Sequence, residues 1–136
     1  MKKVFLDTNV VIDFYQRREP FFAESQAIVQ MAFEKQITLV VSATTMINAF
    51  YILRKYYDAD TLYDKMRSLF LLANVSDITS EILAGALAEQ WGDFEDCVQY
   101  LSATNIEADV IVTRNVKDYT STSIPVMTPT EFLDRV

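Results

Sequence analysis

The stretch that decides the fold is Lys2-Lys3-Val4-Phe5-Leu6-Asp7-Thr8-Asn9-Val10-Val11-Ile12-Asp13. Its apolar run Val4–Leu6 is typical of a strand that is buried on both faces of a parallel sheet. The run stops at Asp7-Thr8-Asn9, residue types that favour turns and helix N-caps. Asp7 should therefore lie where a central strand ends and a helix begins. In open parallel α/β sheets, ligands bind at that edge.

Length and composition indicate one folded domain covering residues 1–136, with a sizeable core. Apolar residues make up 51% of the chain and charged residues 23%, which is typical of a globular, helix-rich protein. The net charge is −7, so binding to nucleic acid would need local basic residues or bound cations. The chain has no histidine, which excludes histidine-based acid–base catalysis and histidine metal ligands.

Several features favour a cytoplasmic location. Cys97 is the only cysteine, so the chain can form no internal disulfide. Lys2-Lys3 precede only a short apolar run, which predicts no secretory signal. The longest uncharged stretch, Gln36–Leu53, changes midway from a strand-like to a helix-like pattern. We therefore expect no membrane span.

Strands and helices alternate along the rest of the chain. Apolar runs predict further strands at Thr38–Val41, Asp109–Thr113 and Pro125–Met127, and a short edge strand at Val75-Ser76. Helical spacing predicts helices between them, which begin near Ser42, Asp60-Thr61, Thr79, Asp93 and Thr128. Phe94 is expected in the core, and Gly92 is expected to end the preceding helix. The alternation predicts an α/β layer fold with a mostly parallel sheet of four to five strands.

Acidic residues recur at points that should meet the edge marked by Asp7. Asp93 and Asp96 are three apart on one predicted helix, so they share a face. Asn115 and Asp118 follow a predicted strand as Asp7 does. Each acid alone could serve as a cap or turn residue, and for Asp93 capping is the favoured interpretation. Together they predict a site for Mg²⁺ or Mn²⁺, which prefer oxygen ligands, and metal-assisted phosphodiester hydrolysis.

Four separated motifs together resemble the PIN domain, the fold of many small ribonucleases and of toxins from toxin–antitoxin pairs. The motifs are Val4-Phe5-Leu6-Asp7-Thr8-Asn9, Val41-Ser42-Ala43-Thr44-Thr45-Met46-Ile47-Asn48, Asp93-Phe94-Glu95-Asp96-Cys97-Val98-Gln99, and Val110-Ile111-Val112-Thr113-Arg114-Asn115 with Val116-Lys117-Asp118-Tyr119. The resemblance implies a three-layer α/β/α sandwich. It also implies an endoribonuclease whose metal ion is held by Asp7, Asp96 and Asp118, with Asp93 as a helper.

Two positions depart from the family's pattern. Asn48 stands where the family usually has glutamate, and Asn115 stands where it often has aspartate after Thr-Arg. Asparagine can bind a hard cation or orient a water molecule, but it brings no negative charge. Asp118 could supply the charge missing at Asn115. We expect Asn48 and Asn115 to orient the attacking water or the substrate, and the metal affinity to be lowered.

Polar residues beside the motifs are candidates for substrate binding. They are Thr8, Asn9, Ser42, Lys55, Thr113 and Arg114. Helical spacing would place Lys55 on the same helix face as Asn48. Arg17 and Arg18 are too isolated in the sequence to be placed. For each basic residue alone, a solvated surface role is the commoner outcome.

Three functions remain open from the sequence. The first is a metal-dependent endoribonuclease, including the toxin of a pair with a separate antitoxin. The second is a catalytically weak or inactive PIN-like module that binds RNA or a protein. The third is a Mg²⁺-dependent phosphatase with Asp7 as its nucleophile, which is disfavoured because no second carboxylate follows two residues later. Surplus apolar residues are compatible with a homodimer: Tyr51, Tyr56, Tyr57, Leu71 and Leu72.

Overall fold

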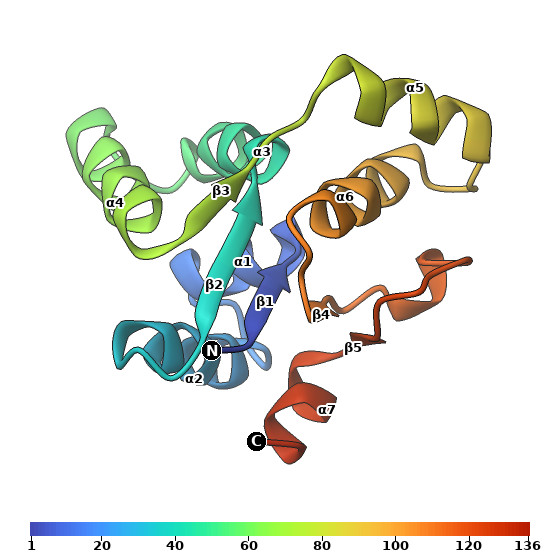
Figure 1. Cartoon of the computed structure of the whole chain (residues 1–136). Helices are drawn as coiled ribbons and strands as arrows, with labels where there is room; N and C mark the ends of the chain where they lie inside the picture. The colour runs from blue at the N-terminus through green and yellow to red at the C-terminus, as the bar shows by residue number, and fades with distance from the viewer.

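A five-stranded sheet, with all of its strand pairs parallel, forms the centre of the molecule in the computed structural model, which describes residues 1–136 (Figure 1). The strand order is β3-β2-β1-β4-β5. The strands are β1 (Lys3–Leu6), β2 (Thr38–Ser42), β3 (Asn74–Ser76), β4 (Val110–Val112) and β5 (Val126–Met127). The predicted α/β fold is therefore confirmed, and β3 is the edge strand expected from Val75-Ser76.

Helices connect the strands and cover both faces of the sheet (Figure 1). They are α1 (Thr8–Tyr15), α2 (Phe22–Phe33), α3 (Ala43–Leu53), α4 (Ala59–Leu72), α5 (Ser80–Glu89), α6 (Phe94–Asn105) and α7 (Pro129–Asp134), with a short 3-10 helix at Val116–Asp118. None of these helices is long and apolar enough to cross a membrane.

Successive residues of the strands point to opposite faces of the sheet, which creates two separate cores. Val4 and Leu6 of β1 belong to the larger core, which also contains residues of α1 to α4 and α7. Phe5, between them, belongs to a smaller core with Ala103 of α6 and Tyr119. Helix α5 packs against α6 through a third cluster. The result is the predicted three-layer α/β/α sandwich.

The order in which strands are added to the sheet reverses at β1. From β1 it proceeds outward to β2 and β3, and it then crosses to the other side of β1 to form β4 and β5. Leu6 is in register with Val112, so β1 and β4 end side by side. This is the topological switch point at which open α/β sheets bind ligands. Asp7 and Thr113, the residues after these strands, therefore lie next to each other.

Most predicted helix starts are confirmed by N-cap hydrogen bonds. The side chains of Asp7, Ser42, Thr79, Asp93 and Thr128 each accept a bond from a backbone N–H in the first turn of the helix that follows. Such a cap stabilises a helix by about 1 kcal/mol.

Three local expectations were wrong. Helix α4 is capped by Asp58 rather than starting at Asp60-Thr61. Helix α5 ends at Glu89, and Gln90 adopts the left-handed conformation (φ 54°), so Gly92 is not its end. Phe94 is 45% exposed because it lies at the first position of α6, where no other element covers it.

Candidate active site

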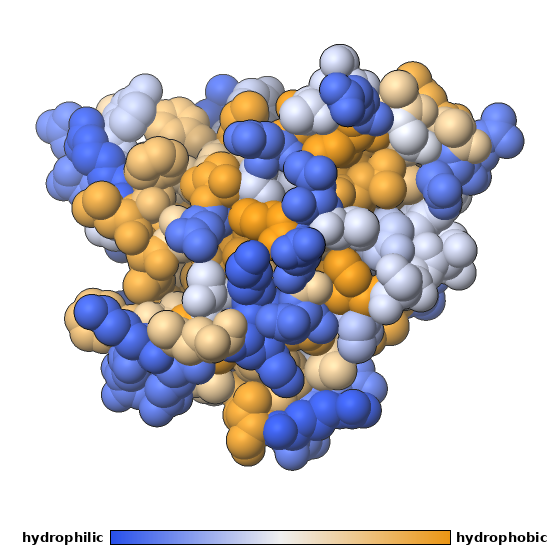
Figure 2. All heavy atoms as spheres, viewed as in Figure 1, coloured by the Kyte–Doolittle hydropathy of each residue, from blue (hydrophilic) through white to orange (hydrophobic).

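A mostly polar pocket of about 290 Å³ lies at the carboxyl ends of β1 and β4. It is lined by Asp7, Thr8, Asn9, Ile12, Arg18, Ile52, Asp93, Glu95, Asp96 and Asn115. Four of these residues are acids. Figure 2 shows hydrophilic residues gathered over the centre of the viewed face, bordered by hydrophobic ones. The predicted convergence of acids at this edge is therefore present.

Asp7 is buried and held by four hydrogen-bond donors. Its Oδ1 accepts from the Thr8 amide (2.8 Å) and from Gln99 Nε2 (3.0 Å). Its Oδ2 accepts from Thr113 Oγ1 (2.8 Å) and from the Tyr119 hydroxyl (3.0 Å). A carboxylate has about four acceptor sites, so these donors fix its orientation. Burial and the charge of Asp7 raise the pKa of Tyr119, which keeps its hydroxyl protonated as a donor.

A buried polar network links Asp7 to the start of α3. Gln99 donates to Thr45 Oγ1 (2.9 Å) as well as to Asp7, and its Oε1 accepts from the Ser42 hydroxyl. The hydroxyls of Thr45 and Thr8 are also hydrogen-bonded (2.8 Å). Ser42 is fully buried and caps α3. Ser42 therefore does not line the pocket, as a substrate-binding residue would have to do. It stabilises the polar network beneath the pocket.

Asp93, Asp96 and Asp118 form the tightest acidic group, with one oxygen of each within 4.8 Å of the others. Asp93 also caps α6, since its Oδ1 accepts from the Asp96 amide (3.0 Å). Asp96 is only 7% exposed, and its Oδ2 is buried without any hydrogen-bond partner. A buried carboxylate oxygen without a partner is costly. Three converging carboxylates, one of which has a buried oxygen without a partner, suit a hard divalent cation.

The concentration of negative charge in the pocket also favours a bound cation. Burial first, and then the charges of Asp7, Asp93, Asp118 and Glu95, raise the pKa of Asp96 to about 8. This concentration of negative charge is unfavourable unless a proton or a cation neutralises it. Strongly perturbed carboxyl groups in a cleft are typical of functional sites.

Glu95 is a site residue that the sequence did not reveal. It lines the pocket, and its Oε1 accepts a hydrogen bond from Asn48 Nδ2 (2.9 Å). The pKa of Glu95 is raised by burial and by the charges of Asp7 and Asp93. An acid on the first turn of a helix is normally explained by the helix dipole. Only the approach of α3 to α6 distinguishes Glu95, and the sequence carries no signal for it.

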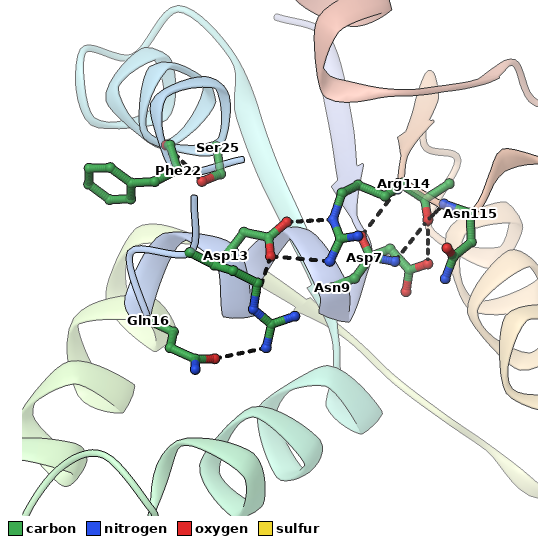
Figure 3. A network of polar contacts seen from close by, with 10 residues as sticks. Asp7, Asn9, Asp13, Gln16, Phe22, Ser25, Arg114 and Asn115 are labelled. Carbon is green, nitrogen blue, oxygen red and sulfur yellow. Dashed lines mark hydrogen bonds and ion pairs between the residues drawn. The ribbon is translucent and has the colours of Figure 1, made fainter. Parts of the chain in front are cut away.

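The loop after β4 is tied to the start of α1, as Figure 3 shows. Asn9 Nδ2 donates to Thr113 Oγ1 (3.1 Å), and Asn9 Oδ1 accepts from the Arg114 amide (3.2 Å). Thr113 Oγ1 also accepts from the Asn115 amide (3.1 Å). These bonds leave the exposed Asn115 on the pocket rim, beside Asn9.

Arg114 reaches away from the pocket acids to Asp13 (Figure 3). Its Nε and Nη2 donate to the two Asp13 oxygens at 2.7 and 3.2 Å, and its guanidinium lies 4.0 Å from the Phe21 ring centre. Asp13 is 1% exposed, so the arginine neutralises a buried charge. The expected substrate-binding residue Arg114 is thus engaged in an internal ion pair.

Lys55 differs from expectation, and Arg18, which the sequence did not place, lies at the pocket. Helix α3 ends at Leu53, so Lys55 lies beyond it, exposed, and the argument that placed it on the helix face of Asn48 does not apply. Arg18 is the one basic residue that lines the pocket. Its Nη2 donates to Gln16 Oε1 (2.8 Å), and its Nε lies 3.8 Å from Asp13 Oδ1.

The sheet order and the acidic switch point define a PIN domain. The sequence model of the PIN domain family matches residues 3–117, and the chain belongs to that family. Ribonuclease VapC1 of Aquifex aeolicus is 27% identical to it, in an alignment of 146 positions that covers 98% of this chain and 95% of the relative.

Solved structures confirm the fold. FitAcB of Neisseria gonorrhoeae superposes with a TM-score of 0.69 at 16% identity, over 93% of this chain and 98% of that one. A protein of a toxin–antitoxin complex of Klebsiella pneumoniae superposes with a TM-score of 0.65 at 23% identity, over 93% of this chain and 97% of that one. VapC20 of Mycobacterium tuberculosis is described as a sarcin–ricin loop cleaving toxin. It superposes with a TM-score of 0.67 at 10% identity, over 90% of this chain and 98% of that one.

Proposed function

We propose that this PIN domain is a divalent-metal-dependent endoribonuclease that hydrolyses RNA phosphodiester bonds in the acidic pocket. The observation that carries the proposal is the Asp96 carboxylate, which converges with those of Asp93 and Asp118 and whose Oδ2 is buried without a hydrogen-bond partner. The ribonuclease name of the curated relative supports RNA as the substrate class.

The ion would be Mg²⁺ or Mn²⁺, because the pocket offers oxygen ligands and neither histidine nor a pocket cysteine. Asp93, Asp96 and Asp118 would hold it. Asp7 would add negative charge from the pocket wall, because donors already occupy its acceptor sites. When bound, such an ion activates water and neutralises charge on a phosphodiester.

The other pocket residues would position the RNA. Arg18 can pair with a phosphate that approaches the acids, and Thr8, Asn9 and Asn115 can hydrogen-bond to the ribose or phosphate from the rim. The network around Gln99 keeps Asp7 in one orientation while substrate exchanges.

We further propose a cytoplasmic toxin that is blocked by a separate antitoxin protein, because one fold neighbour comes from a toxin–antitoxin complex and another is described as a toxin. A homodimer is compatible with the exposed apolar side chains Ile47, Tyr51 and Tyr63 on α3 and α4. Growth arrest on expression, relieved by Asp96→Asn, is the expected result for a toxin. Unimpaired growth with abundant active enzyme would contradict that role.

A second candidate is a PIN-like module that binds RNA or a protein without cleaving it. The observation that favours it is the presence of asparagine instead of a carboxylate at positions 48 and 115. Such a binder would not need a metal ion.

Cleavage of a mixed RNA pool with Mn²⁺ tests the enzymatic proposal. We expect cleavage by the wild type, none in EDTA, and a loss of at least about 100-fold in Asp96→Asn, because metal activation of the nucleophile is lost. The matched control is Glu34→Gln, an exposed acid at the opposite end of the strands, which should cleave normally. Equal cleavage by Asp96→Asn would remove Asp96 from the mechanism.

A further inference from the structure

We infer that Glu95 is an additional cation-binding residue of this pocket and that Asn48 is its positioning residue. The inference deepens the proposed function and rests on it, since it assigns further residues to the same metal site.

Glu95 and Asn48 meet across two helices that the chain brings together only in three dimensions. Asn48 projects from the middle of α3, and Glu95 lies in the first turn of α6. The Asn48 amide donates to Glu95 Oε1 at 2.9 Å. A glutamate on an exposed helix surface normally samples several rotamers. This charge-assisted hydrogen bond selects one of them.

The selected position places the Glu95 carboxylate in the wall of the pocket that contains Asp7, Asp93 and Asp96. Glu95 has no ion pair with a lysine or arginine in the structure. Its hydrogen bond to Asn48 therefore leaves its charge uncompensated beside three other acids. Such an arrangement is unfavourable unless a proton or a shared cation neutralises part of the charge.

An independent observation points to that cation. Asp96 is the first buried residue of α6 and lines the pocket, and its Oδ2 is buried without a partner. Glu95, one residue earlier, presents its carboxylate to the same pocket. Asp96 supplies an oxygen ligand for the ion. Glu95 supplies a nearby negative charge, which can bind the ion directly or through its water ligands.

The asparagine at position 48 acquires a definite role from this geometry. Its amide donates a hydrogen bond, which a carboxylate at the same place could not do. The side chain thus affects the cation through Glu95, and not by its own charge. Removing the amide should matter only while Glu95 carries its carboxylate.

A double-mutant cycle on Mn²⁺ affinity, measured by isothermal titration calorimetry, tests both assignments. We expect Glu95→Gln to weaken Mn²⁺ binding about 10-fold, as is typical of groups around a metal site. Asn48→Leu should weaken it about fivefold, as expected for one lost hydrogen bond. The double variant should bind like Glu95→Gln alone, because the two residues act in series. Glu34→Gln should bind like the wild type.

Mn²⁺ binding by Glu95→Gln that equals the wild type would overturn the inference, and so would independent, additive losses in the double variant. If that happens while Asp96→Asn still loses binding and cleavage, the endoribonuclease proposal stands without Glu95. Conversely, a wild type that binds Mn²⁺ in a Glu95-dependent way but cleaves no RNA would retain this inference and refute the proposed activity. A wild type that binds no Mn²⁺ overturns the inference.

Discussion

Asp7 and Asp96 lie in the same pocket but in opposite chemical situations. Asp7 has a donor for each of its acceptor sites, and these bonds fix its position. Asp96 is also buried but has an oxygen without a partner, among four other acids. In the metal-free protein the ionised Asp96 carboxylate is therefore destabilising. Binding of a proton or a cation to it should increase the free energy of unfolding.

The raised pKa of Asp96 predicts how stability depends on pH in EDTA. The folded state holds this proton up to about pH 8, whereas the unfolded chain releases it near its ordinary value of 3.8. The folded state thus binds more protons between these values, so its stability should fall as pH rises, by at most ~1.4 kcal/mol per pH unit.

Urea unfolding at several pH values between 5 and 8 checks this prediction. Asp96→Asn cannot titrate, so its free energy of unfolding should change less with pH than that of the wild type. Parallel pH profiles for the two proteins would show that Asp96 is not the titrating group.

At the scale of elements, the ion pair between Arg114 and Asp13 joins the loop after β4 to α1. Arg114→Met should destabilise the fold by about 3 kcal/mol, because it leaves the buried Asp13 charge without its main partner. Arg18→Met should cost less than about 1 kcal/mol, since Arg18 is more exposed and farther from Asp13.

The same two variants should separate structure from substrate binding. Arg18→Met should raise the KM for RNA at nearly unchanged stability, because it removes the pocket's basic residue. Chemical unfolding and cleavage kinetics measure the two effects. A reversed pattern, with Arg18 important for stability and Arg114 for KM, would contradict these roles.

Much of the architecture was predictable because buried parallel strands are continuous apolar runs and their ends are marked by cap residues. Asp7, Ser42 and Thr128 are examples in which local sequence alone specifies the helix start. Local sequence cannot specify which surfaces approach each other. Glu95 and Arg18 belong to the pocket only because distant elements pack beside them, and Lys55 lies outside it because α3 ends early.

At the scale of the whole molecule, the negative charge opposes the approach of RNA. The net charge is −7, and one arginine lines the pocket. In EDTA, RNA binding by the wild type should therefore be weak, with a slope of log affinity against log salt smaller than about 2 in magnitude. Fluorescence anisotropy with labelled single-stranded RNA measures this slope. Tight, steeply salt-dependent binding without metal would instead favour the binding-module alternative.

The central claim is that the unpartnered Asp96 oxygen is a ligand of a divalent cation. The most direct test is a crystal structure with Mn²⁺, using anomalous difference density to locate the ion. We predict a peak between Asp93, Asp96 and Asp118, within about 2.0–2.4 Å of Asp96 Oδ2. A fully soaked, well-ordered crystal with no anomalous peak in this pocket would contradict the account.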